Sequence, residues 1–247
     1  MIAIMLSAGK GTRMYPLTAN TPKALIDIGK GKTILENQLD VLQACGISKV
    51  YIVAGYLIEQ IKAKVTGYPL QEMEVEFIHN PFYETSNNIV SLWLALLVNK
   101  ESCISINGDD IFKPIIIETL LKQKGDIVMT IDRKEIYDED DMLVVTKERK
   151  IYAVGKDLDK EKANGESVGI IKYSSMGVKI ISKTLDDMLV DLENHNKFYL
   201  AALQKVMDNG FSVNYCEVDW KDWSEIDFHP DVNDVREKVE FFVKSFK

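Results

Sequence analysis

The sequence predicts an α/β fold of the Rossmann-like type, in which a mostly parallel sheet has helices on both faces and a small antiparallel lobe is added. Two patterns predict it. In the first half, short apolar runs alternate with segments of helical spacing, which is typical of strands buried in a parallel sheet. In the second half, short strand-like runs are separated by charged turns. Because ligands of such sheets bind beyond the carboxyl ends of the strands, a site is expected in the loops there.

The first half supplies the parallel core. Its predicted strands are Ile2–Leu6, Val50–Val53, Val75–Ile78, Cys103–Ile106 and Ile127–Ile131. Helical spacing predicts helices over Ile34–Leu42, Leu57–Val65, Asn88–Val98 and Pro114–Leu121. Asn87 or Asn88 is a suitable cap for the third of these helices. The loops of greatest interest then follow Leu6, Ile78 and Ile106.

The second half predicts shorter strands and three helices. The strands are Met142–Val145, Ile151–Val154, Val168–Tyr173 and Val213–Val218, and the helices are Met176–Leu192, Tyr199–Asp208 and Val232–Ser245. The chain contains no linker, internal repeat or low-complexity tract. We therefore expect residues 1–247 to form one domain, with a core over 1–131, a lobe over 132–230 and a C-terminal helix over 231–247.

Net charge, cysteine spacing and the lengths of apolar stretches indicate which kinds of binding partner the chain can have. The chain has 247 residues and a net charge of −8, which disfavours a nucleic-acid partner but leaves room for a small anion held by local lysines and arginines. The three cysteines have no metal-binding spacing, so reduced thiols in a cytoplasmic protein are expected. No signal peptide is recognised, and the longest apolar stretch, Ile89–Val98, is too short to span a bilayer, so no membrane partner is expected.

The loop after the first strand carries the strongest functional signal. It runs from Leu6 through Ser7-Ala8-Gly9-Lys10-Gly11-Thr12 to Arg13, and Lys23 follows after two prolines. Glycines after a strand let backbone N–H groups close on an anion, and Lys10, Arg13 and Lys23 add three positive charges. The loop is therefore suited to a triphosphate.

Two similar motifs can be excluded. A dinucleotide fingerprint would require glycine where the chain has Met14. Gly31-Lys32-Thr33 imitates the end of a Walker motif, but the first glycine of that motif would fall on Ile26. We interpret this tripeptide as a turn and the start of a helix.

The run Gly9–Lys23 resembles the signature of the sugar-phosphate nucleotidyltransferase family, roughly G-x-G-T-R-x-x-P-x-T-x-x-x-P-K. Every fixed position of that signature is matched. The resemblance implies that Arg13 binds the β- and γ-phosphates and that Lys23 contacts the α-phosphate and the acceptor, both as catalytic residues. The nucleotide-binding residues that it implies here are Leu6, Ala8, Gly9, Lys10, Gly11, Thr12, Arg13 and Lys23.

A metal site is expected after the fourth strand. Gly108-Asp109-Asp110 lies at its carboxyl end, where a carboxylate can bind Mg²⁺. The family has a Gly-Asp pair at this point, whose aspartate binds the metal and takes part in catalysis, and Asp109 matches it. The resemblance also implies a late second ligand, for which Asp227 is the best match. Asp110 is expected to point elsewhere.

The third loop and the acidic run 138–141 bear on specificity. The amides of Asn80 and Asn88 and the hydroxyl of Ser91 are expected to bind the base, and this region resembles the branch of the family that uses CTP with phosphocholine or aminoethylphosphonate. Asp141, in the densest acidic run, is expected to bind a cationic acceptor together with Tyr199 and Lys23. No aromatic residue lies between Asp138 and Asp141, which favours a primary amine over a quaternary one.

The predicted function is therefore a CTP-dependent cytidylyltransferase that uses Mg²⁺ and transfers CMP to 2-aminoethylphosphonate or phosphocholine, releasing pyrophosphate. The lobe 132–230 would bind the acceptor. Two alternatives stay open: a sugar-1-phosphate nucleotidyltransferase, and a non-catalytic nucleotide-binding regulatory homologue. The sequence also leaves a homodimer open.

Overall fold

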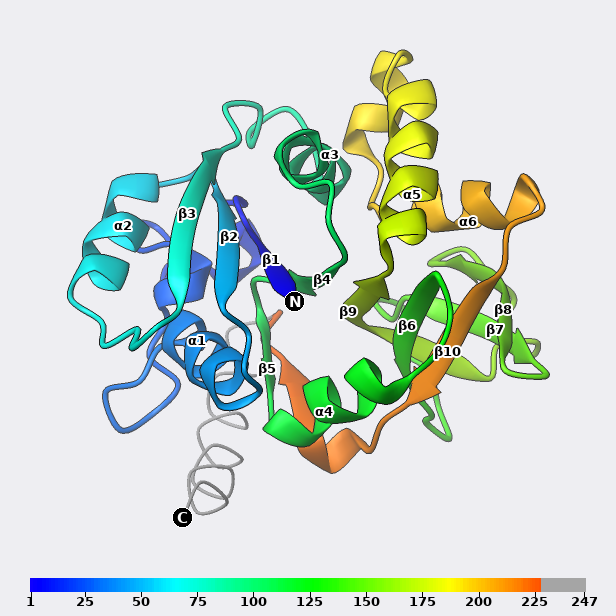
Figure 1. The fold of residues 1–247 in the computed structure, drawn as a ribbon, viewed down its shortest axis with the longest axis horizontal. Coiled ribbons are helices and arrows are strands. Elements are labelled where there is room, and N and C mark those ends of the chain that lie inside the picture. The colour runs from blue at the N-terminus through cyan, green and yellow to red at the C-terminus, as the bar shows by residue number, and fades with distance from the viewer. Residues whose placement is uncertain (228–247) are drawn as a thin grey trace.

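The computed structural model describes residues 1–227, so the helix predicted over Val232–Ser245 lies outside the described residues. Within this range the main sheet has nine strands in the order β3-β2-β1-β4-β9-β6-β10-β8-β7 (Figure 1). The strands are β1 (Ile2–Ser7), β2 (Lys49–Ala54), β3 (Glu74–His79), β4 (Cys103–Asn107), β6 (Ile127–Asp132), β7 (Leu143–Lys147), β8 (Lys150–Gly155), β9 (Gly165–Tyr173) and β10 (Val213–Glu217). A separate two-stranded sheet pairs β5 (Asp110–Phe112) with β11 (Trp223–Glu225).

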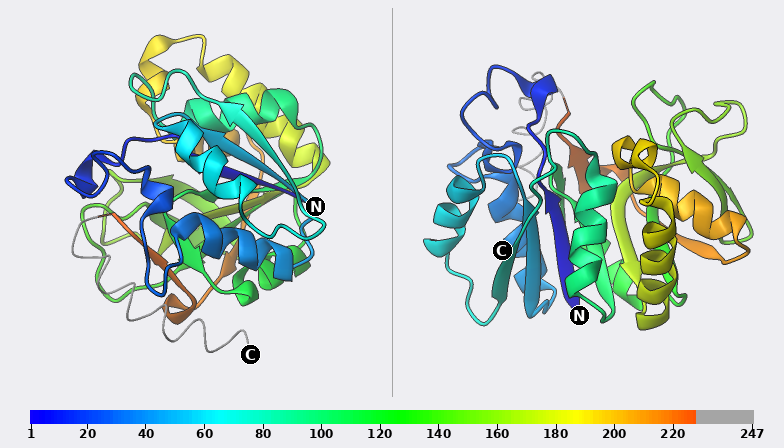
Figure 2. Two further views of the ribbon diagram at one scale, coloured as in Figure 1. Left: turned by 90° about the vertical axis from the view of Figure 1, so that its left-hand side faces the viewer. Right: turned by 90° about the horizontal axis from the view of Figure 1, so that it is seen from above.

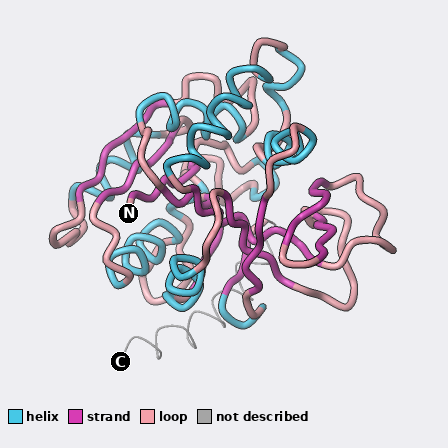
Figure 3. The backbone as a smooth tube through the Cα atoms, turned by 45° about the vertical axis from the view of Figure 1, so that its right-hand side comes forward, coloured by secondary structure: helices cyan, strands magenta, loops and turns pink. Residues whose placement is uncertain are grey.

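The predicted fold class is confirmed. Strands β3, β2, β1 and β4 are parallel in register, as the alternation in the first half predicts. Strand β9 then lies between β4 and β6 and is antiparallel to both. The apolar run Val168–Tyr173 predicts this strand but does not indicate which strands lie beside it. The strand, expected in the lobe, is part of the main sheet. The β7–β8 hairpin lies at the opposite end of the sheet from β3 (Figure 2, right; Figure 3).

Helices cover both faces of the sheet. They are α1 (Ile34–Ala44), α2 (Ile58–Thr66), α3 (Asn88–Val98), α4 (Pro114–Lys122), α5 (Ser175–Met188) and α6 (Leu200–Asp208). In β1, Ile4 and Leu6 pack into the core with α3, α5 and α6, while Ala3 and Met5 pack into the core with α1, α2 and α4. Successive side chains of a strand point to opposite faces, so this strand is buried on both sides.

Helix ends follow local chemistry. Thr33 caps α1, and its side chain and that of Glu36 form a reciprocal capping box, which confirms that 31–33 is a turn and helix start. The predicted end of α5 at Leu192 is wrong, since the helix stops at Met188 and a 3₁₀ turn occupies Leu192–Asn196. Leu192 is 77% exposed, so its apolar side chain does not continue the buried helix face.

The short strands β5 and β11 were not predicted. Each has three residues, too few for a recognisable alternation. They matter because they join the end of the described chain to the loop after β4, at the edge where β1, β4 and β6 end and β9 begins. None of the helices within residues 1–227 has both the length and the apolar character needed to cross a membrane.

Candidate active site

The loop after β1 brings Lys23 against Gly11. Gly11 has φ 62°, a left-handed conformation, and the hydroxyl of Thr18 donates to its carbonyl at 2.7 Å. A methyl group at Gly11 would lie 3.2 Å from both Cβ of Lys23 and Cγ2 of Thr18. The glycine and threonine of the signature therefore fix the turn that places the lysine.

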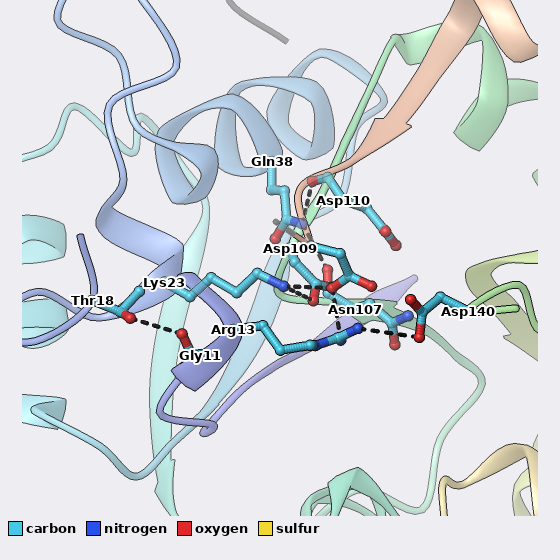
Figure 4. Close-up of polar contacts among 10 residues, drawn as sticks. Gly11, Arg13, Thr18, Lys23, Gln38, Asn107, Asp109, Asp110 and Asp140 are labelled. Carbon is cyan, nitrogen blue, oxygen red and sulfur yellow. Dashed lines mark hydrogen bonds and ion pairs between the residues drawn. The ribbon is translucent and has the colours of Figure 1, made fainter. Parts of the chain in front are cut away.

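Lys23 lies at the centre of a charged cluster. Its Nζ is 2.6 Å from Oδ2 of Asp109 and 2.9 Å from Oδ1 of Asp227, and Nη2 of Arg13 is 2.9 Å from the same Asp227 oxygen (Figure 4). Burial lowers the pKa of Lys23, but the two carboxylates outweigh it and the net pKa is raised. The lysine is therefore a permanent cation. The residues that the sequence predicted for phosphate and metal binding are brought together.

Gly108 and the β5–β11 pair position the two aspartates. The N–H of Gly108 donates to the carbonyl of Leu6 at 3.0 Å, and a methyl group at Gly108 would lie only 2.4 Å from Oγ of Ser7. The backbone just before Asp109 therefore lies in close contact with the start of the signature loop. On the other side, the N–H of Ile226 donates to the carbonyl of Asp109, which brings Asp227 close to it.

Glu225 is a third carboxylate that the sequence analysis missed. Oxygen atoms of Asp109, Glu225 and Asp227 lie within 4.8 Å of one another. Burial raises the pKa of Glu225, and the carboxylates of Asp109 and Asp227 raise it further. The alternation Glu225-Ile226-Asp227, with Ile226 buried, is the signal that both acids face the same side. Three clustered carboxylates are hard donors that suit a divalent cation such as Mg²⁺.

Asp110 points away from this cluster, as expected (Figure 4). Its side chain is buried, and among the described residues neither carboxylate oxygen has a hydrogen-bond partner. Burial raises its pKa well above the usual range, and Asp109 and Glu225 add to the shift. Its backbone carbonyl accepts a hydrogen bond from Gln38 of α1 at 2.7 Å, which anchors the start of β5.

A first cavity of ≈ 560 Å³ opens above the cluster. The predicted residues that line it are Leu6, Ala8, Gly9, Gly11, Thr12, Arg13, Lys23, Asn80, Asn88, Ser91, Asp109, Asp141, Tyr199 and Asp227. Lys10 is not among the lining residues; its Nζ lies 2.5 Å from Oε1 of Glu84. The loop backbone and Arg13 therefore face the cavity, whereas the side chain of Lys10 bridges to the neighbouring loop.

The side chains predicted to bind the base are held by hydrogen bonds within the protein. Nδ2 of Asn80 donates to Oγ of Ser91 at 2.9 Å, which ties the loop after β3 to α3. Asn87, not Asn88, caps α3. Oδ1 of Asn88 accepts the N–H of Tyr199 at 2.9 Å. These contacts make a firm wall of polar groups rather than a set of loose side chains.

A second cavity of ≈ 630 Å³ lies beside the first. Both are lined by Asp140, Asp141, Glu166, Glu225 and Asp227. Asp141 forms an ion pair with Lys134 at 3.1 Å. The predicted acceptor residue Tyr199 lines only the first cavity, where its hydroxyl donates to the carbonyl of Gly169 at 3.3 Å.

Glu166, a residue that the sequence analysis did not select, belongs to the shared wall. Oε2 of Glu166 lies 2.7 Å from Nζ of Lys134. Burial raises the pKa of Glu166 to about 8; the Lys134 ammonium opposes this shift and the Asp141 carboxylate adds to it. A lone glutamate at the start of a strand gives no local sequence signal, because its role depends on what β6 and β7 place beside it.

Comparisons with known proteins identify the family of the chain. A family described as the MobA-like NTP transferase domain matches residues 3–169. The chain is 25% identical to a CTP:phosphoglutamine cytidylyltransferase of Campylobacter jejuni, with 94% of this chain and 98% of that protein covered. It is 29% identical to a choline-phosphate cytidylyltransferase of Streptococcus pneumoniae, with 83% and 94% covered.

Solved structures support the fold. A CTP:phosphocholine cytidylyltransferase from Streptococcus pneumoniae matches with a TM-score of 0.78 at 23% identity, covering 96% of this chain and 99% of that one. An inositol-1-phosphate CTP transferase from T. maritima matches with a TM-score of 0.79 at 21% identity, covering 97% and 96%. With the family match over more than half of its length, the chain belongs to the MobA-like NTP transferase family and is a nucleotidyltransferase.

Proposed function

We propose that this enzyme transfers CMP from CTP to a small phosphate or phosphonate acceptor that carries an ammonium group, and releases pyrophosphate. The observation that carries the proposal is the position of Lys23. Its ammonium bridges Asp109 and Asp227 where the two cavities adjoin, so a group bound in one cavity can react with a group bound in the other. The relatives named as cytidylyltransferases support CTP as the donor.

The first cavity suits the nucleotide. Ala8, Gly9, Gly11 and Thr12 line it, and their backbone N–H groups would bind the triphosphate. Arg13, whose side chain is 45% exposed and pairs with Asp227 and Asp140, lines the same cavity and would bind the β- and γ-phosphates there. Asn80 and Ser91, fixed by their mutual hydrogen bond, supply donors and acceptors for the base.

Asp109 and Asp227 would hold a magnesium ion, with Glu225 beside them. The fit rests on their clustered carboxylate oxygens, which lie within 4.8 Å of one another together with those of Glu225. When bound, Mg²⁺ supplies positive charge that offsets the charge of the triphosphate. Lys23 supplies a second positive charge from the signature loop.

The chemical step needs no general base from the protein. The acceptor phosphate or phosphonate is ionised at neutral pH, and one of its oxygens forms a bond to the α-phosphorus while the bond from that phosphorus to the bridging oxygen of pyrophosphate breaks. The barrier comes from bringing two anions together. Lys23 lowers it by lying against both, and Arg13 stabilises the charge that develops on the leaving pyrophosphate.

The second cavity suits a cationic acceptor. Carboxylates dominate its wall, including Asp138, Asp140 and Asp141 from the acidic run. Two tryptophans also line it, but Trp223 is only 7% exposed and its indole N–H is bonded to Asp132, so Trp220, 56% exposed, offers the accessible aromatic face. A quaternary ammonium is usually held by several aromatic faces, so the carboxylate-rich wall favours a primary amine such as that of 2-aminoethylphosphonate over phosphocholine.

A matrix of donors and acceptors tests this proposal. Pyrophosphate release is measured with CTP, UTP, GTP and ATP, each against 2-aminoethylphosphonate, phosphocholine and glucose 1-phosphate, in the presence of Mg²⁺. The proposal predicts the highest kcat/KM for CTP with 2-aminoethylphosphonate. A preference for the sugar phosphate would support the sugar-1-phosphate alternative instead, because that acceptor offers no cation to the acidic wall.

A further inference from the structure

We propose that Glu166 is the residue that selects the acceptor, by accepting a hydrogen bond from a primary ammonium group in the second cavity. This inference deepens the proposed function and rests on it. Glu166 lies in β9 directly opposite Asp132 of β6 and Leu143 of β7, so the sheet holds it on both sides. A residue fixed by strands discriminates between ligands better than one in a loop.

The carboxylate of Glu166 is buried and only half satisfied. Its side chain is 4% exposed, and Oε2 lies 2.7 Å from Nζ of Lys134. Oε1 is buried, and no N–H or hydroxyl group of the described residues donates to it. An unmatched buried carboxylate oxygen costs folding free energy, and such groups recur where a ligand supplies the missing donor.

Three other acids on this wall have partners. Asp140 pairs with Lys156 at 3.0 Å, and Asp132 accepts the indole N–H of Trp223 at 2.9 Å. Asp141 accepts from Lys134 and from the N–H of Asp138. Its carboxylate also lies within hydrogen-bonding reach of Glu166, whose pKa of about 8 means that, near neutral pH and without a ligand, the two acids share a proton.

The geometry also sets the kind of cation. Glu166 lines both cavities. An acceptor bound in the second cavity with its phosphate directed towards Lys23 and Asp227 would therefore lie beside Glu166. Oε1 lacks a donor from the protein, and a primary ammonium has N–H groups to supply one whereas a quaternary ammonium has none. A charge-assisted hydrogen bond from that ammonium would take the place of the proton shared with Asp141 and stabilise the ionised form of Glu166.

The test compares two acceptors that differ in one group, 2-aminoethylphosphonate and 2-hydroxyethylphosphonate. Glu166→Gln keeps the side-chain shape and an oxygen for Lys134 but cannot take on the negative charge that pairs with a bound ammonium. We expect kcat/KM for the amine to fall about 10- to 100-fold, through the KM of the acceptor, and that for the hydroxyl analogue to change less than about threefold. Glu166→Asp, which keeps the charge, should retain part of the preference for the amine.

Glu217→Gln is the matched control. Glu217 also pairs with a cation, Nε of Arg133 at 2.8 Å, but it does not line either cavity. The control should leave both acceptors unchanged. If Glu166→Gln weakens both acceptors equally while CTP binding is intact, Glu166 only supports Lys134 and the inference is overturned.

Failure of the proposed function has a different outcome. The wild-type enzyme would then release pyrophosphate with neither 2-aminoethylphosphonate nor phosphocholine. The selection of an amine by Glu166 would be rejected together with it, before any variant is compared.

Discussion

Lys23, the last residue of the signature, forms ion pairs with two carboxylates, those of Asp109 and Asp227. Burial alone would favour the neutral amine, yet Asp109 at 2.6 Å and Asp227 at 2.9 Å keep it charged. A fixed ammonium of this kind is worth most where negative charge develops in a site partly shielded from water.

Lys23→Ala should therefore lower kcat by roughly 10²–10³ in a folded enzyme, by analogy with the removal of other groups that stabilise charge. Steady-state pyrophosphate release with saturating CTP and acceptor measures this. Lys32→Ala is the control, because Lys32 pairs with Asp40 and does not line either cavity. Near-normal kcat in a folded Lys23→Ala variant would contradict the role assigned to the lysine.

The sequence predicts the site residues that belong to a motif or follow a recognisable strand, but not Glu166. Lys23, Arg13, Asp109 and Asp227 carry a motif or follow a strand, and the structure brings them together. Glu166 is not predicted, because a single buried acid forms no recognisable sequence pattern. Its neighbours come from strands that are distant in the chain.

At the scale of elements, the signature turn depends on a backbone conformation. Gly11 has a left-handed φ, and any side chain there would crowd Lys23. Gly46, after α1, has φ 73° but nothing within 4 Å of an added methyl group. Alanine at either position strains the backbone, but only alanine at Gly11 would also displace Lys23. Comparing the two substitutions therefore distinguishes the two effects.

Gly11→Ala and Gly46→Ala should each lower the free energy of unfolding by roughly 1–2 kcal/mol, the cost of a left-handed alanine. Only Gly11→Ala should also lower kcat, by about 10- to 100-fold, because a small displacement of an aligned catalytic group is costly. Chemical denaturation and pyrophosphate release measure the two effects. Equal kcat in both variants would show that the turn does not position Lys23.

Element prediction succeeded where local patterns were long. The parallel strands β1 to β4 and the helices between them follow apolar runs and helical spacing. The β5–β11 pair, which carries Asp110 opposite Glu225, was missed because three residues cannot establish a period. The end of α5 was misplaced because apolar residues outside the helix imitate its buried face.

At the scale of the whole molecule, the site exists only when the two ends of the described chain meet. Lys23 and Asp227 are 204 positions apart, and the antiparallel strand β9 continues the sheet from β4 to β6 beneath them. Sequence patterns predict the class of fold but not this pairing, because register and neighbours of distant strands are set by long-range packing. The two adjoining cavities are a consequence of that packing.

The central claim is that Lys23, Arg13 and the carboxylate cluster hold the metal-bound triphosphate of CTP. A crystal structure of the enzyme with CTP and Mg²⁺ tests it most directly. We expect an α-phosphate oxygen about 3 Å from Nζ of Lys23. Arg13 should contact the outer phosphates, the metal should be bound by Asp109 and Asp227, and cytosine should lie beside Asn80 and Ser91. A nucleotide bound away from both Lys23 and Arg13 would rule out the role assigned to this cluster.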